Sequence, residues 1–169
     1  MDDDWYPPER PAMPEGPEHF PATGVNSLAS YGVRGVARAI DSLLIGLPVL
    51  AVGIGTLAAT DADPNQGFPE WVAAVWFVLT VVYEVLFVRW RGQTLGKLAV
   101  GIKVSRLDNG RPPLWWQAGI RIALPAIAAG LPFGIASVAY VAVYSSSAWS
   151  PVRRGIHDKA AGTVVVVAR

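Results

Sequence analysis

Charged side chains interrupt stretches that are otherwise apolar enough to lie in lipid. Arg34, Arg38 and Asp41 precede residues 42–59, which contain no ionisable side chain. At about 100° per residue, these three positions fall within roughly 60° of one another on a helix. Glu84 is the single charge in the next apolar block. A carboxylate in a membrane needs a partner, so both acids either form structural ion pairs or bind a proton or cation.

The C-terminal part carries a second group of side chains with acid–base chemistry. His157 stands next to Asp158, with arginines and a lysine around them. The sequence has no cysteine and no tightly spaced His-Glu-x-x-His pattern, so no nucleophile or metal-ligand set accompanies this pair. We therefore expect no enzyme, no catalytic residue, no metal and no cofactor.

A glycine-containing segment, Gly92–Lys97, superficially resembles a phosphate-binding loop. It has three residues between its glycines where that loop has four, and Leu98 where serine or threonine should follow. We predict instead a tight turn in which Gly92 and Gly96 allow close approach of the backbone. Lys97 would then face lipid headgroups or Glu84.

The composition is that of a membrane protein with one domain. The 169 residues are 52% hydrophobic and 16% charged, and the apolar residues come in blocks. From residue 28 onward there are 13 lysines and arginines against 7 acids. This basic surplus is too small and dispersed for nucleic-acid binding, but it suits a face against anionic headgroups on the cytoplasmic side of a bilayer.

The elements that must position the charges are predicted to be mostly membrane helices. Residues 34–59 and 70–88 are each long enough to cross a bilayer. The basic link 89–121 is expected in the cytoplasm by the positive-inside rule. Within it, residues 101–106 alternate like a strand, and their expected partner is the strand at 163–168.

A third apolar block, residues 118–147, contains Pro125 and Pro132. Two half-helices of about 12–15 residues are too short for two full crossings, since each reaches only about 18–22 Å. We therefore expect a proline-broken or re-entrant segment that leaves the C-terminus in the cytoplasm, beside the other strand. The predicted fold is an all-α membrane protein with a small strand pair.

The N-terminal residues 1–27 contain six prolines and six acids. We predict a disordered cytoplasmic tail that is separate from the membrane domain of residues 28–169. A tail of this composition is also a candidate ligand for a proline-recognising protein.

Three segments in order resemble the RDD family of bacterial membrane proteins, named for an arginine and two aspartates. They are Arg34-x-x-Ala-x-x-x-Asp41, Gly92-x-Thr94-x-Gly96-Lys97 with its following Gly-Ile-Lys-Val, and Arg154-Gly-Ile-His-Asp158-Lys-Ala-Ala-Gly-Thr-Val-Val. The resemblance implies a small helical protein of the bacterial cell membrane, for which transport of ions or other ligands is the usual expectation. The family arginine falls on Arg34, with Arg38 as a rival, and the two aspartates on Asp41 and Asp158.

Two functional interpretations stay open. The first is a small transporter of protons, Na⁺ or small solutes that uses intramembrane carboxylates and works as a homo-oligomer. The alternative is a membrane scaffold or accessory subunit whose buried charges are structural ion pairs. Under either interpretation we expect one polar cluster in the inner leaflet, consisting of Arg34, Arg38, Asp41, Glu84, Gly92, Thr94, Gly96, Lys97, Arg121, Arg154, His157, Asp158, Gly162 and Thr163.

Overall fold

The computed structural model describes residues 16–60, 67–129 and 133–169. The main helices are α1 (Tyr31–Thr60), α2 (Glu70–Arg91), α4 (Trp115–Ala129) and α5 (Phe133–Ser145). The shorter elements are the helical turns η1 (Pro17–His19) and η3 (Ser146–Trp149), the helices α3 (Leu95–Ala99) and α6 (Ile156–Ala160), and the strands β1 (Ile102–Arg106) and β2 (Thr163–Val167).

Helices α1 and α2 are both long and apolar enough to cross a membrane. Their 30 and 22 residues correspond to about 45 Å and 33 Å of helix. Only 17% of the most apolar window of each is buried, whereas the core helix of a soluble protein would be largely covered. Leu47 and Val52 of α1, for example, are each more than half exposed. Side chains of this kind indicate contact with lipid, and the two predicted spans match these helices.

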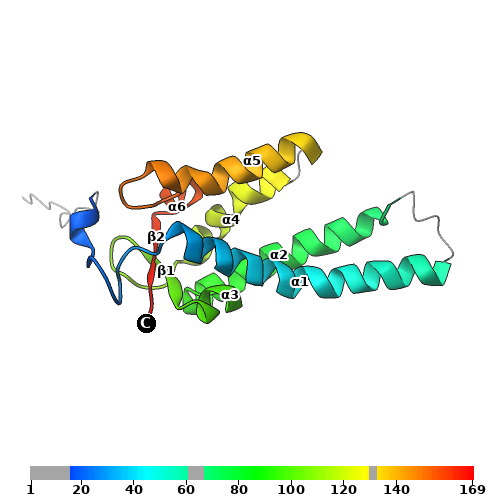
Figure 1. Cartoon of the computed structure of the whole chain (residues 1–169), viewed down its shortest axis with the longest axis horizontal. Helices are drawn as coiled ribbons and strands as arrows, with labels where there is room; N and C mark the ends of the chain where they lie inside the picture. The colour runs from blue at the N-terminus through cyan, green and yellow to red at the C-terminus, as the bar shows by residue number, and fades with distance from the viewer. Residues whose placement is uncertain (1–15, 61–66, 130–132) are drawn as a thin grey trace, which may run out of the picture.

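The two short strands pair antiparallel at one end of the helices. Ile102 lies opposite Val167, and Arg106 lies opposite Thr163. The predicted strand pair is therefore confirmed. Because the strands are bonded to each other, the link after α2 and the C-terminal segment lie at the same end of the molecule (Figure 1).

The residues just before α1 join this sheet. The Asn26 N–H donates to the Val167 carbonyl, and the Ala29 N–H donates to the Val165 carbonyl. Phe20 packs on the small apolar cluster beside β2. The last residues of the predicted tail thus contact the sheet, while its first 15 residues lie outside the described residues.

We call β1, β2, α3 and α6 the platform. Its apolar contacts with the helices form the main core, which consists of Ala29, Ala37, Val88, Ile102, Val104, Ala118 and Val165. Small and β-branched side chains at the start of α1, the end of α2 and the start of α4 therefore pack on the inner face of the sheet. The charged residues of the helices lie at this same end.

Helices α4 and α5 pack against each other as a shorter pair (Figure 1). They have 15 and 13 residues, as expected for two half-helices. The chain returns to the platform after α5, since the rings of Tyr144 and His157 lie 5.2 Å apart. Pro125 was expected to interrupt the block, but α4 continues through it. The predicted break at Pro132 lies outside the described residues.

Candidate functional site

Asp41 is buried on α1 and is held by three neutral donors. Its Oδ1 accepts from the Tyr83 hydroxyl and from the Gly96 N–H, each at 2.7 Å. Its Oδ2 accepts from the Thr94 hydroxyl at 2.6 Å. Asp41 takes part in none of the ion pairs identified between described side chains, and its charge acts on Lys97. The sequence left open whether Asp41 forms an ion pair or binds a proton or cation, and its hydrogen bonds in the structure all come from neutral donors.

The turn from Gly92 to Gly96 brings two of these donors, Thr94 and Gly96, to Asp41. Gly92 ends α2 in a left-handed conformation, with φ at 68°, and a Cβ there would lie 2.6 Å from the Val104 carbonyl oxygen. Gly96 lies directly on α1, where a Cβ would collide with the Ala37 carbonyl and the Asp41 carboxyl group. The predicted close approach is confirmed at both glycines. Only glycine at position 96 lets the backbone N–H reach Asp41.

Glu84 on α2 is neutralised by two cations. Its Oε2 lies 2.5 Å from an Arg38 nitrogen, and its Oε1 lies 3.5 Å from Lys97 Nζ. Of the two positions predicted for Lys97, contact with Glu84 is therefore the one observed. Burial lowers the pKa of Lys97, and the negative charge of Glu84 partly opposes this shift.

Asp158 at the start of α6 is the third buried carboxylate, and it also has two cations. Arg121 from α4 makes a close ion pair with its Oδ1, and Arg34 from α1 lies 3.6 Å from its Oδ2. Burial alone would raise the pKa of Asp158, but the charges of Arg121 and Arg34, with a hydrogen bond from the Gly155 N–H, lower it below the usual value. This carboxylate therefore links α1, α4 and the platform through charge.

His157 is buried beside this ion pair. Its Nε2 lies 3.6 Å from Asp158 Oδ1, and its Nδ1 is buried without a hydrogen-bond partner in the described structure. Burial lowers the pKa of His157, which outweighs the opposing charge of Asp158. The imidazole is therefore neutral at pH 7.

The remaining predicted residues support the turn between α6 and β2. The Arg154 side chain donates to the carbonyls of Thr163, Asp158 and Lys159. The Thr163 hydroxyl accepts from Arg121 at 3.2 Å. Gly162 has a φ of 64°, in the left-handed region that the turn into β2 requires. These contacts position Asp158 and do not add a further ion pair to its carboxylate.

The charged residues thus form two neighbouring ion-paired groups, and the charge of Arg121 in one acts on Glu84 and Lys97 in the other. Arg38, Glu84 and Lys97 form one, and Arg34, Arg121 and Asp158 form the other. The first two arginines of α1 were expected to share one stripe, but each joins a different group. Of the residues matched to the family arginine, Arg34 is the one that contacts Asp158.

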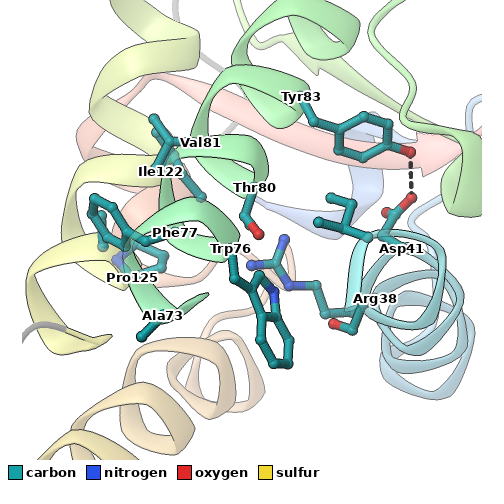
Figure 2. A pocket seen from close by; sticks show the side chains of 13 residues that line it. Arg38, Asp41, Ala73, Trp76, Phe77, Thr80, Val81, Tyr83, Ile122 and Pro125 are labelled. Atoms are coloured by element: carbon teal, nitrogen blue, oxygen red, sulfur yellow. Dashed lines mark hydrogen bonds between the residues drawn. The ribbon is translucent and has the colours of Figure 1, made fainter. Parts of the chain in front are cut away.

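A cavity of about 330 Å³ lies between α1, α2 and α4, next to Asp41. Figure 2 shows the Arg38 side chain and the Thr80 hydroxyl directed into it, with Trp76 along one side and the Tyr83–Asp41 hydrogen bond at its edge. Thr80 Oγ1 is buried without a partner in the described structure. The cavity therefore combines apolar walls with several oxygen atoms.

A second cavity, of about 660 Å³, lies between α1, α5 and the platform. Its charged lining comes from both groups of ion pairs, namely Arg34, Arg38, Glu84, Lys97, Arg121 and Asp158. Arg38 and Ser42 line both cavities and so separate them.

Two tyrosines complete the site and were not identified from the sequence. The Tyr83 hydroxyl donates to Asp41 and accepts from the Leu95 N–H at 2.8 Å. The ring of Tyr144 lies under the Arg38 guanidinium, 5.2 Å from its centre. Tyrosine in an apolar helix is a usable signal, because its hydroxyl needs a partner when buried. Tyr83 also stands directly before Glu84.

The comparisons with known proteins identify the family of this chain. The sequence profile of the RDD family matches residues 28–162. The chain is similar to an uncharacterized protein, YckC, of Bacillus subtilis (strain 168), with 26% identity over 144 residues that cover 83% of this chain and 85% of the relative. No solved structure matches this chain.

Proposed function

Because this chain belongs to the RDD family and has two exposed apolar helices, it is a membrane protein, and we propose that it transports protons or Na⁺. Asp41 is the carboxylate that binds and releases the transported ion in this proposal. The observation that supports this proposal is that the three buried carboxylates differ in the basic side chains next to them.

Glu84 and Asp158 each lie against two basic side chains. Their negative charge is already balanced, so another cation would gain little there. Asp41 is held only by hydroxyl groups and a backbone N–H. Neutral donors fix its geometry but leave its charge to be balanced by a proton or a metal cation.

The cavity beside Asp41 offers further ligands for such an ion. Ser42 and Thr80 bring hydroxyl groups to it, and the Thr80 oxygen has no partner within the described residues. Hard cations are bound by oxygen atoms, and carboxylates that line cavities within membranes are typical of ion pathways. The Arg38 guanidinium that also points into this cavity is paired with Glu84, so the oxygen atoms are the ligands that the proposal gives to an ion next to Asp41.

The orientation in the cell membrane forms part of the proposal. The basic residues around the platform favour the cytoplasmic side for both chain termini and for the 89–121 link. The α4–α5 pair enters the bilayer from that side and returns to it as a third, re-entrant segment. Reporter fusions at residues 65, 108 and 169 test this topology. An extracellular reporter at residue 169 would contradict it.

Ion flux tests the role of Asp41. Purified protein in lipid vesicles should dissipate an imposed proton or Na⁺ gradient, and Asp41→Asn should abolish this flux. Asp108→Asn is the matched control, since it removes an acid from an exposed ion pair with Arg106. Both variants should elute from a size-exclusion column at the same volume as the wild type. Equal flux for wild type and Asp41→Asn would exclude Asp41 as the ion-binding group.

A structural scaffold is the second candidate function. The hydrogen bonds of Asp41 fasten α1 to α3, which is what a purely structural carboxylate would do. On this account the wild-type protein carries no ion flux, and Asp41→Asn lowers stability alone. Such a scaffold would act through a protein partner or a second copy, and deleting residues 1–27 tests whether the proline-rich tail recruits that partner.

A further inference from the structure

The larger cavity has an excess of basic side chains. Four basic residues line it, against the two acids Glu84 and Asp158. Both acids are already paired with these bases, and burial keeps the nearby His157 neutral by lowering its pKa. The lining therefore has two more positive than negative charges, and Asp41 of the adjoining cavity, whose charge acts on Lys97, offsets part of this excess. Buried unbalanced charge is costly, so this cavity favours an anion.

The cavity is polar at one end and apolar at the other. Arg34, Arg121 and Lys97 lie next to the platform. Ala39 of α1 and Val141 of α5 line it farther along these helices, and both are exposed on the outer surface of the protein. The two helices meet where the Arg38 guanidinium of α1 lies over the Tyr144 ring of α5, and both of these residues line the cavity. An occupant with a charged head and an apolar tail matches these two ends.

Two exposed tryptophans indicate how deep in the bilayer the charged end of the cavity lies. Trp90, at the end of α2, is 84% exposed, and Trp149, at the end of η3, is 79% exposed. Tryptophan prefers the headgroup level of a bilayer, and these two flank the platform. The basic end of the cavity therefore lies at the depth of lipid phosphates.

We propose that this cavity binds the phosphate group of an anionic amphiphile, with its apolar tail leaving between α1 and α5. A phospholipid of the platform-side leaflet is the source that the apolar end of the cavity favours. Free phosphate shares the same chemistry at the basic end. The site is distinct from the ion site at Asp41, which belongs to the smaller cavity.

Lipid binding by the full chain in detergent tests this site. Native mass spectrometry should find phosphatidylglycerol retained about fivefold more than zwitterionic phosphatidylcholine, as one additional charge interaction predicts. Ala39→Trp places a large side chain in the cavity at an exposed position and should remove this preference. Ala51→Trp is the matched control, because it lies exposed on the same helix and lines neither cavity.

Inorganic phosphate distinguishes the two sources. If phosphate alone raises the unfolding temperature and displaces phosphatidylglycerol, the phosphate site stands and the free ion is its ligand. If phosphate does neither while the lipid preference holds, the ligand is the lipid headgroup. Equal retention of the two lipids, or the same lipid preference in Ala39→Trp as in wild type, would overturn the proposal. Circular dichroism and elution volume verify the fold of both variants.

Discussion

Asp41 and Asp158 are both buried aspartates at the platform end of the helices, but their surroundings are opposite. Asp158 lies against two arginines, so its negative charge is balanced within the protein. Asp41 is held by two hydroxyl groups and one backbone N–H. A buried acid can thus be fixed in place with or without being neutralised. In the proposed transport, the acid held by neutral donors is the one that exchanges a proton or cation.

Removing the charge of Asp158 should have the largest effect on stability. In Asp158→Asn, Arg34 and Arg121 stay buried without their shared counter-ion, so the free energy of unfolding should fall by about 3–5 kcal/mol. Denaturation in detergent, followed by circular dichroism, measures this change. In Asp108→Asn the exposed pair with Arg106 is lost, which should cost less than about 1 kcal/mol. Equal effects would show that the Asp158 pairs are not structural.

A methyl group at position 96 should lower stability almost as strongly as Asp158→Asn does, because it disturbs the surroundings of Asp41. The added Cβ meets the Ala37 carbonyl and the Asp41 carboxyl group, so Gly96→Ala should destabilise by about 3 kcal/mol. Gly55→Ala on α1 has no atom within 4 Å of its Cβ and should be neutral or stabilising. Thermal unfolding of the two variants measures the difference in their stability. A neutral Gly96→Ala would mean that α3 does not pack on α1 as described.

Asp41→Asn should destabilise less than Asp158→Asn. The amide keeps one acceptor oxygen, so the variant leaves one or two of the Tyr83, Thr94 and Gly96 donors unpaired and creates no buried unbalanced arginine. We expect a loss of about 1–2 kcal/mol, measured by the same denaturation. A loss as large as that of Asp158→Asn would remove the distinction between the two acids.

A substitution of His157 should have the smallest effect on stability, and the effect should appear only in how stability depends on pH. Burial, with Arg121 and Arg34, lowers its pKa in the folded protein against the opposing charges of Asp158 and Glu84. The unfolded chain therefore takes up a proton first as the pH falls below about 6.5, and stability should decrease from pH 7 toward pH 5. Unfolding temperatures across this range should fall less in His157→Gln. Asp158, whose folded pKa is lowered, contributes only below about pH 4.

The sequence allowed prediction of the elements that follow from local patterns. Both long helices are continuous apolar stretches, and the paired strands alternate or consist of β-branched residues. The glycines at 92 and 96 could be predicted to permit close contact because no other residue has that freedom. Helix α4 continues through Pro125 against expectation, since local proline preferences yield to the packing of neighbouring helices.

The pairing within the site could not be read from the chain. Helical spacing places Arg34, Arg38 and Asp41 on one stripe, but it does not say which neighbour each one meets. Arg34 meets Asp158 across more than a hundred residues, and Arg38 meets Glu84. Asp41 finds one donor, Tyr83, on α2 and two, Thr94 and Gly96, in a turn whose position depends on the packing of α3. Such contacts are tertiary, so only the folded structure distinguishes the neutralised acids from Asp41.

The most direct test of that distinction is the infrared difference spectrum of the reconstituted protein when the pH or the Na⁺ concentration is changed. The account predicts a carboxyl band that changes with the ion, persists in Glu84→Gln and Asp158→Asn, and disappears in Asp41→Asn. A band that is unchanged in Asp41→Asn would contradict the central claim, because another carboxylate would then carry the exchange.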